Sequence, residues 1–165
     1  MCCRLMAKNI KNKKDVNNEL QKDGATQQEA AIVNAIAQTE TTHMSVQQRD
    51  GTKSGSSTNY GIYNINLDLA KQIDSSLDLN SLNQDTPEAR AAATKLTLQG
   101  IRKLGVNPFL NENRAGSAGA NVGNGDCQYD CKGYRDNVYG IANQILKDPL
   151  LLTDNRRVNT QLTHY

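Results

Sequence analysis

The chain has no tryptophan, a single phenylalanine and only two histidines. His43 and His164 have no partners at zinc-ligand spacing, so we expect no metal site, and nothing in the sequence calls for a cofactor. No apolar run is long enough to span a membrane. The net charge is only +2, and the one basic run (Lys8, Lys11, Lys13 and Lys14) is interpreted as a solvated N-terminus rather than a nucleic-acid arm. These shortages argue against metal, membrane and nucleic-acid partners.

The length bounds the architecture. A chain of 165 residues can bury one core, and it has no internal repeat and no linker that would divide it. We expect a flexible basic segment over 1–24, a single folded domain over 25–152 and a polar tail over 153–165, in a monomeric protein.

Capping and periodicity signals predict a mainly helical domain. Thr26 and Glu29 form a capping box that opens an amphipathic helix over 26–41. Thr86, Pro87 and Glu88 supply an N-cap, a first-turn proline and an acidic first turn for a helix that stops near Gly105. Further helices are expected over 67–73 and about 134–147, and residues 150–152 are expected to pack back on the body.

Two segments lack a helical pattern. Residues 60–66 predict a short strand or hairpin arm, with Ile62 and Ile65 in the core and Tyr63 undecided. Residues 108–125 are rich in Gly and Asn, which predicts an irregular loop suited to one wall of a cleft.

Glu40 is unusual because it extends the apolar stripe of its helix. Ile32, Ile36 and Glu40 lie at i, i+4 and i+8, so they share one face. Partial burial and the negative end of the helix dipole would both favour the protonated acid. A carboxyl group kept neutral near pH 7 can act as the general acid of a glycosidase. The alternative is a helix-end glutamate whose stem covers apolar surface while its head reaches water.

The order of several short blocks supports the first interpretation. Glu40-Thr41-Thr42-His43-Met44 is followed by Asp50-Gly51-Thr52-Lys53, by Asn59-Tyr60-Gly61-Ile62-Tyr63, by residues 109–119 and by residues 134–141. This series resembles the motifs of the endo-β-1,4-mannanases of glycoside hydrolase family 134. The resemblance covers about 31–145, most of the chain.

The resemblance implies a fold and a mechanism. It implies an α+β, mainly helical, lysozyme-like fold in which a small β-hairpin lobe forms one side of a cleft. It also implies internal cleavage of β-1,4-mannan with inversion, with Glu40 as general acid and Asp50 as general base. In such enzymes the two carboxyl groups lie about 6.5–9.5 Å apart, leaving room for the attacking water. Arg49 and Lys53 beside Asp50 should keep that carboxylate ionised.

By the same resemblance, other residues would contact the polysaccharide. Those matched to its motifs or regarded as candidates for sugar contact are Lys53, Asn59, Tyr60, Phe109, Asn113 and Arg114. His43 would support the acid. Several of these residues also have a plainer interpretation: a loop charge for Lys53, core or hairpin packing for the aromatics, a structural turn for Arg114, and a structural histidine for His43.

Alternatives remain open in substrate and in function. Phe109 and Asn113 stand where the family has tryptophan and histidine, which permits a lysozyme-like hydrolase of another wall polymer such as peptidoglycan, chitin or chitosan. A carbohydrate-binding protein on the same fold, without turnover, is a further possibility.

The cysteines and the N-terminus bear on location. Cys127 and Cys131 could close a small disulfide loop, whereas Cys2 and Cys3 are either free or acylated. The sequence as given begins without a signal peptide, although the resemblance implies an extracellular protein.

Overall fold

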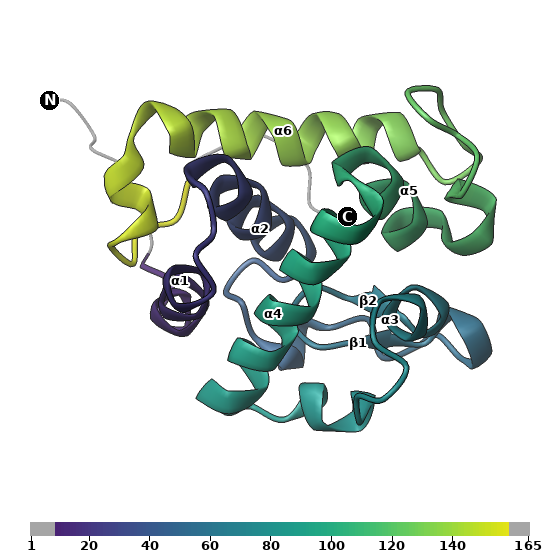
Figure 1. Ribbon diagram of the computed structural model, residues 1–165, viewed down its shortest axis with the longest axis horizontal. Helices are drawn as coiled ribbons and strands as arrows, with labels where there is room; N and C mark the ends of the chain where they lie inside the picture. Colours follow the sequence, from purple (N-terminus) through teal and green to yellow (C-terminus); the bar gives the residue numbers. More distant parts are fainter. Residues whose placement is uncertain (1–8, 159–165) are drawn as a thin grey trace, which may run out of the picture.

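The computed structural model describes residues 9–158, and within this range the chain is mainly helical with one small antiparallel sheet. The helices are α1 (Lys13–Lys22), α2 (Gln27–Glu40), α3 (Leu67–Ile73), α4 (Pro87–Leu104), α5 (Val106–Ala115) and α6 (Cys131–Lys147), and the strands are β1 (Asn59–Tyr60) and β2 (Ile65–Asn66). Figure 1 shows α6 along one edge of the molecule, with the hairpin and α3 toward the opposite side. The expected α+β, mainly helical class is confirmed.

Helix α2 is the centre of the core. Its predicted capping box is present: the Thr26 hydroxyl accepts from the backbone N–H of Glu29 at 3.1 Å, and the Glu29 carboxylate accepts from the N–H of Thr26 at 2.9 Å. Every residue from Ala30 to Thr39 is buried, and the helix packs along α6 (Figure 1). Glu40 is therefore the last residue of a helix whose ten preceding residues are enclosed in the core.

Helices α4 and α5 adjoin at Gly105, whose φ of 89° interrupts the helical path. The N-terminus of α4 follows the predicted signals, since the Thr86 hydroxyl accepts from the N–H of Ala89 at 3.1 Å. Helix α5 corrects the expectation of an irregular loop over 108–125. Pro108 lies in the first turn of α5, where a missing N–H costs no helical hydrogen bond, so it does not break the helix. Irregular chain follows a 3-10 turn over Gly116–Gly119.

The sheet is a two-stranded hairpin in which Asn59 pairs with Asn66 and Tyr60 with Ile65. The turn between the strands interrupts the alternation expected for 60–66, because Ile62, Tyr63 and Asn64 are all buried together. The placement of Ile62 and Ile65 in the core is confirmed.

Thr41 and Tyr63 make two of the hydrogen bonds that hold this hairpin to the helices. The Thr41 hydroxyl, just after α2, donates to the carbonyl of Ile62 at 2.6 Å. The Tyr63 hydroxyl lies 2.8 Å from the hydroxyl of Thr94 in α4. The hairpin turn therefore has a fixed position relative to the end of α2.

The described part of the N-terminal segment is folded, which corrects the expectation of flexibility over 1–24. Helix α1 buries Val16 and Leu20 in the core. Lys13 has no exposed surface, and its Nζ donates to the carbonyl of Arg156 at 2.8 Å. Burial lowers the pKa of Lys13 to about 8. Lys13 thus belongs to the packed structure and not to a solvated basic run.

The start of the expected C-terminal tail also packs on the body. The N–H of Ile10 donates to the carbonyl of Asn155 at 2.6 Å, and the N–H of Val158 donates to Oε1 of Gln38 at 3.0 Å. Val158 is buried, and so is Leu151 in the preceding 3-10 turn. The described residues 153–158 are therefore part of the fold, and the packing expected for 150–152 is confirmed at Leu151.

Cys127 and Cys131 form a disulfide at the start of α6. The expectations for Cys2, Cys3, Lys8 and His164 concern positions outside the described residues. Over residues 9–158, no helix has the length and apolar character needed to cross a membrane.

Candidate active site

A polar cleft of about 490 Å³ lies between the hairpin side of the molecule and the C-terminal end of α5. Glu40 and Asp50 both line it. The other lining side chains are mainly amides and hydroxyls, with a few charges: Lys53, Ser56, Ser57, Asn59, Asn64, Asn66, Asp68, Asn113, Arg114, Ser117 and Tyr129. Such a lining offers many hydrogen bonds to a ligand rich in hydroxyl groups.

Glu40 is held by three side chains from three separate elements. The Tyr134 hydroxyl in α6 donates to Oε1 at 2.6 Å, and Nδ2 of Asn64 in the hairpin turn donates to Oε2 at 3.0 Å. Nδ2 of Asn113 in α5 lies 3.4 Å from Oε1. The carboxyl group is therefore fixed between α6, α5 and the hairpin while it faces the cleft.

The environment of Glu40 favours its protonated form. Burial raises its pKa to about 7, against the opposing effects of the hydrogen bonds from Tyr134 and Asn64 and of the nearby Arg114 charge. Burial also raises the pKa of Tyr134 well above its usual value, and the Glu40 charge adds to this, so Tyr134 remains a hydrogen-bond donor at neutral pH. Glu40 is consequently divided between acid and carboxylate near neutrality.

Asp50 has the opposite environment. Its Oδ1 accepts from the hydroxyl of Thr52 at 2.6 Å and from the N–H of Thr52 at 3.0 Å. These bonds lower its pKa below the usual value, with smaller contributions from the Lys53 and Arg49 charges. Asp50 is only partly buried, so it is an ionised carboxylate open to the cleft at neutral pH.

Asn64 connects the two carboxyl-bearing segments. While its Nδ2 donates to Glu40, its Oδ1 accepts from the backbone N–H of Asp50 at 3.0 Å. Its φ of 46° is in the left-handed region, which asparagine tolerates better than most residues. The hairpin turn thus places one buried carboxamide in contact with both Glu40 and the backbone of Asp50.

Several sequence-predicted residues do lie at this cleft. Lys53, Asn59 and Arg114 line it, as Glu40 and Asp50 do. Asn113 lines it too, but its Nδ2 is directed inward, to Glu40, to the carbonyl of Tyr63 at 3.2 Å and to the Tyr134 hydroxyl at 3.3 Å. The Nδ2 of Asn113 is therefore engaged with Glu40, Tyr63 and Tyr134 and is not directed to a ligand in the cleft.

Three predicted residues lie elsewhere. Phe109 is fully buried, and its ring packs so closely against Gly100 that a β-carbon there would meet it at 2.7 Å. The prediction that Phe109 contacts substrate is therefore corrected: it is a core residue. Tyr60 is half-buried against the core and is outside the cleft lining. His43 is exposed and is also outside that lining, so it does not support Glu40 as the resemblance implied.

Sequence reasoning missed Asn64, Tyr134 and Tyr129. Asn64 carried a partial signal, because an asparagine in a short turn between strand residues is a common left-handed position. Tyr134 carried no signal of its own, since its contact with Glu40 spans 94 residues of sequence. Within residues 9–158 no group of three or more His, Cys, Asp or Glu side chains is arranged to hold a metal ion.

The two carboxyl groups, one favoured as acid and one as carboxylate, make this cleft a candidate site for paired acid and base chemistry. Comparison of the sequence with known proteins finds no matching family model and no matching curated protein.

Proposed function

We propose that this protein is an inverting glycoside hydrolase on a lysozyme-like fold, with Glu40 as general acid and Asp50 as general base. One observation carries the proposal: two carboxyl groups line the same cleft, and their surroundings move their pKa values in opposite directions. An inverting glycosidase needs such a pair, one group to protonate the leaving oxygen and the other to activate water on the opposite face of the sugar.

Glu40 suits the acid. Tyr134 and Asn113 both donate to Oε1, whereas Asn64 donates to Oε2, so the second lone-pair direction that can carry the proton is on Oε2. A proton on Glu40 can therefore be presented to a glycosidic oxygen in the cleft. With a pKa of about 7, a substantial fraction of Glu40 is protonated at neutral pH.

Asp50 suits the base. Both hydrogen bonds from Thr52 reach Oδ1, which leaves Oδ2 to accept a proton from water. The lowered pKa of Asp50 keeps it ionised while Glu40 is protonated. As water attacks the anomeric carbon, Asp50 takes its proton and Glu40 gives its own to the departing sugar oxygen, so one C–O bond forms and one breaks.

The proposed substrate is a β-1,4-linked polysaccharide outside cells, with β-1,4-mannan the first choice because of the family 134 resemblance. The polar lining of the cleft is compatible with a ligand rich in hydroxyl groups. The Cys127–Cys131 disulfide supports an oxidising, extracellular location. We propose that the enzyme acts as a monomer.

A second candidate substrate is another wall polymer, peptidoglycan or chitin. The observation in its favour is that two positions matched to the mannanase motifs do not face the cleft as free sugar contacts. Phe109 is buried in the core, and the Nδ2 of Asn113 is directed to Glu40 and to backbone. The mannan specificity of the family would have to be provided by other residues.

The test is reducing-sugar release from linear β-mannan, peptidoglycan and chitosan. We expect cleavage of mannan, loss of at least about 99% of the rate in Glu40→Gln, and a similar loss in Asp50→Asn. Asp74→Asn is a matched control, because Asp74 accepts from Ser76 at 2.9 and 2.6 Å, much as Asp50 does from Thr52, but is not part of the cleft lining. Glu88→Gln, at an exposed site on α4, controls for Glu40→Gln.

The possible outcomes separate the proposals. Cleavage of another polymer alone would overturn the mannan assignment and keep the hydrolase. Full activity in Asp50→Asn would exclude Asp50 as the base. Folded protein that cuts none of the three polymers but binds them would favour a carbohydrate-binding protein instead.

A further inference from the structure

Few aromatic side chains within residues 9–158 are exposed enough to contact a ligand. In the described residues, those that are fully buried or partly buried against the core are Tyr60, Tyr63, Phe109, Tyr134 and Tyr139. Tyr129 differs, because 50% of its surface is exposed and it lines the same cleft as Glu40. Tyr129 and Leu150 are the exposed large apolar side chains of the described residues, and of these two only Tyr129 lines the cleft.

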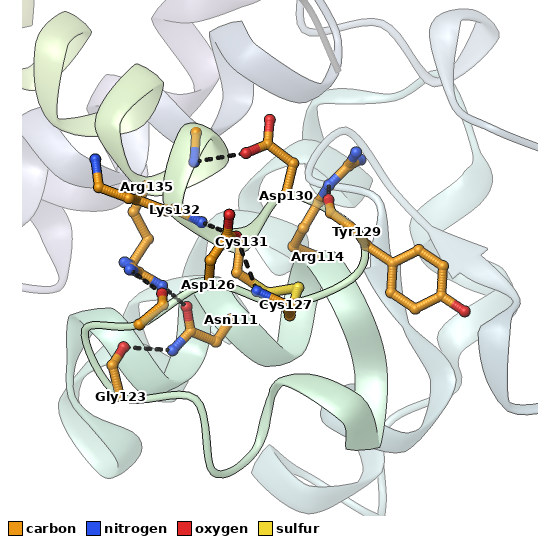
Figure 2. Close-up of a disulfide and its surroundings, with 12 residues drawn as sticks. Asn111, Arg114, Gly123, Asp126, Cys127, Tyr129, Asp130, Cys131, Lys132 and Arg135 are labelled. Carbon is orange, nitrogen blue, oxygen red and sulfur yellow. Dashed lines mark hydrogen bonds between the residues drawn. A yellow bond between two sulfur atoms is a disulfide. The ribbon is translucent and has the colours of Figure 1, made fainter.

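Tyr129 is held at the tip of a short covalent loop. It lies between Cys127 and Cys131, which are joined by the disulfide, and Figure 2 shows its ring projecting away from that loop. Asp126 stiffens the same loop, since its Oδ1 accepts from the N–H groups of Cys127 at 2.8 Å and Lys132 at 3.0 Å. The backbone around Tyr129 is therefore fixed on both sides.

Residues 123–125, which precede the disulfide loop, are held by hydrogen bonds from α5 and α6. The buried Arg135 donates from Nη2 to the carbonyls of Asn124 at 2.8 Å and Gly125 at 2.6 Å. Asn111 donates to the carbonyl of Gly123 at 2.9 Å and accepts from Arg135 (Figure 2). Asn111 of α5 and Arg135 of α6 thus hold residues 123–125, the part of the loop that leads to Tyr129.

One hydrogen bond links Tyr129 to the catalytic side of the cleft. Nε of Arg114 donates to the carbonyl of Tyr129 at 2.7 Å, and the Arg114 guanidinium lies 6.0 Å from the centre of the Tyr134 ring. Tyr134 in turn donates to Glu40. Tyr129 is therefore positioned relative to Glu40 through Arg114 and Tyr134.

We propose that Tyr129 is the aromatic platform of a sugar subsite, on which one pyranose ring of the polysaccharide packs, and that the Cys127–Cys131 loop holds this platform in place. The inference rests on the proposed function, because a sugar polymer must occupy the cleft. A flat ring held by a short loop gives large contact area at little cost in conformational entropy, and the apolar C–H face of a pyranose matches it.

Binding is measured with Glu40→Gln as the background, so that no hydrolysis interferes, and with mannohexaose, chitohexaose and a peptidoglycan fragment as ligands. By calorimetry, Tyr129→Ala should weaken binding of the preferred ligand roughly fivefold, the range that one aromatic contact provides. Tyr129→Phe keeps the ring and should bind within about twofold of the parent. Leu150→Ala, at an exposed apolar side chain outside the cleft lining, should leave affinity unchanged.

A second readout uses the absence of tryptophan from the chain. Tyr129→Trp introduces a single indole whose emission reports on this position alone, and saturating ligand should shift or quench it. Leu150→Trp is the matched control and should not respond. Unchanged affinity in Tyr129→Ala, an unresponsive indole at position 129 with ligand bound, or no binding of any of the three ligands would each overturn the inference.

These results are distinguishable from a failure of the proposed function. Hydrolysis by the wild type together with unchanged affinity in Tyr129→Ala would remove the subsite and keep the enzyme. Ligand binding on Tyr129 without hydrolysis by the wild type would keep the subsite and remove the enzyme.

Discussion

Asn64 and Glu40 are joined side chain to side chain, with Nδ2 of Asn64 donating to Oε2 of Glu40 at 3.0 Å. The other end of the same carboxamide accepts from the N–H of Asp50 at 3.0 Å. Asn64 is buried in the hairpin turn, so it has little freedom to move. One side chain therefore sets the proposed acid relative to the segment that carries the proposed base.

Asn64→Gly should lower kcat by about 10- to 100-fold. Glycine accepts the φ of 46° at this position, so the substitution removes the side chain without straining the turn. Loss of the two hydrogen bonds would free the Asp50 segment and misplace the base by a fraction of an ångström, which suffices for a rate loss of this size. Steady-state kinetics would measure it. A normal kcat in folded Asn64→Gly would show that Asn64 does not position the pair.

The pH dependence of kcat/KM should be bell-shaped, because the proposed mechanism requires protonated Glu40 and ionised Asp50. The rate should fall above pH about 7 as Glu40 loses its proton, and on the acid side below the usual pKa of an aspartate, about 3.8. Tyr134→Phe removes a hydrogen bond that stabilises the ionised form of Glu40 and should therefore move the basic limb to higher pH.

Tyr63→Phe is the matched control for that shift. Tyr63 is also a fully buried tyrosine, but its hydroxyl pairs with Thr94 and not with Glu40. Its removal should cost about 1 kcal/mol of stability and leave the pH profile unmoved. A basic limb that stays in place in Tyr134→Phe would contradict the assignment of that limb to Glu40.

Glu40 should destabilise the protein as the pH rises. Its pKa is raised from a usual 4.5 to about 7, so the folded state binds more protons than the unfolded state between these values, and stability falls across this window. In Glu40→Gln the side chain at position 40 is a carboxamide, which does not titrate in this pH range. The variant should gain stability relative to wild type from pH 4.5 to 8, by an amount on the order of 3 kcal/mol.

Urea unfolding of the two proteins at pH 4.5 and pH 8 would measure this gain. Glu88→Gln, the same substitution at an exposed site on α4, is measured alongside as the matched control. An identical stability difference for Glu40→Gln at both pH values would mean that the pKa of Glu40 is not raised in the folded protein.

The Cys127–Cys131 disulfide should affect substrate binding more than chemistry. A bridge over so short a loop contributes about 2 kcal/mol of stability. The double substitution Cys127→Ser and Cys131→Ser should raise KM for the polymer several-fold while kcat changes less than twofold, because the Tyr129 loop loses its restraint but Glu40 and Asp50 keep theirs. An unchanged KM would count against a binding role for the loop.

The sequence predicts the elements that have strong local signals. The capping box of Thr26 and Glu29 and the Thr86-Pro87-Glu88 start locate α2 and α4, because these signals act within one helical turn. Local sequence patterns do not predict helix α1. It has few apolar residues, and its buried face includes Lys13, whose partner is the carbonyl of Arg156, 143 residues away.

In the candidate site, too, the residues with local sequence signals are predictable and the others are not. Glu40 and Asp50 are readable from the apolar stripe and from the loop chemistry, and both line the cleft. Phe109 is misassigned because its direction depends on how α5 packs against Gly100 of α4, which no local pattern encodes. Tyr134 and Asn113 reach Glu40 across long sequence separations for the same reason.

The most direct test of the central claim is the anomeric form of the first product, followed by ¹H NMR during cleavage of the polymer that the wild type cuts fastest. Mannan, chitin and the peptidoglycan glycan are all β-1,4-linked, so an inverting pair at Glu40 and Asp50 must release the α-anomer first, before mutarotation. Initial accumulation of the α-anomer, abolished in Glu40→Gln and Asp50→Asn, is the predicted result. Initial accumulation of the β-anomer would contradict the assignment of Asp50 as a base acting through water.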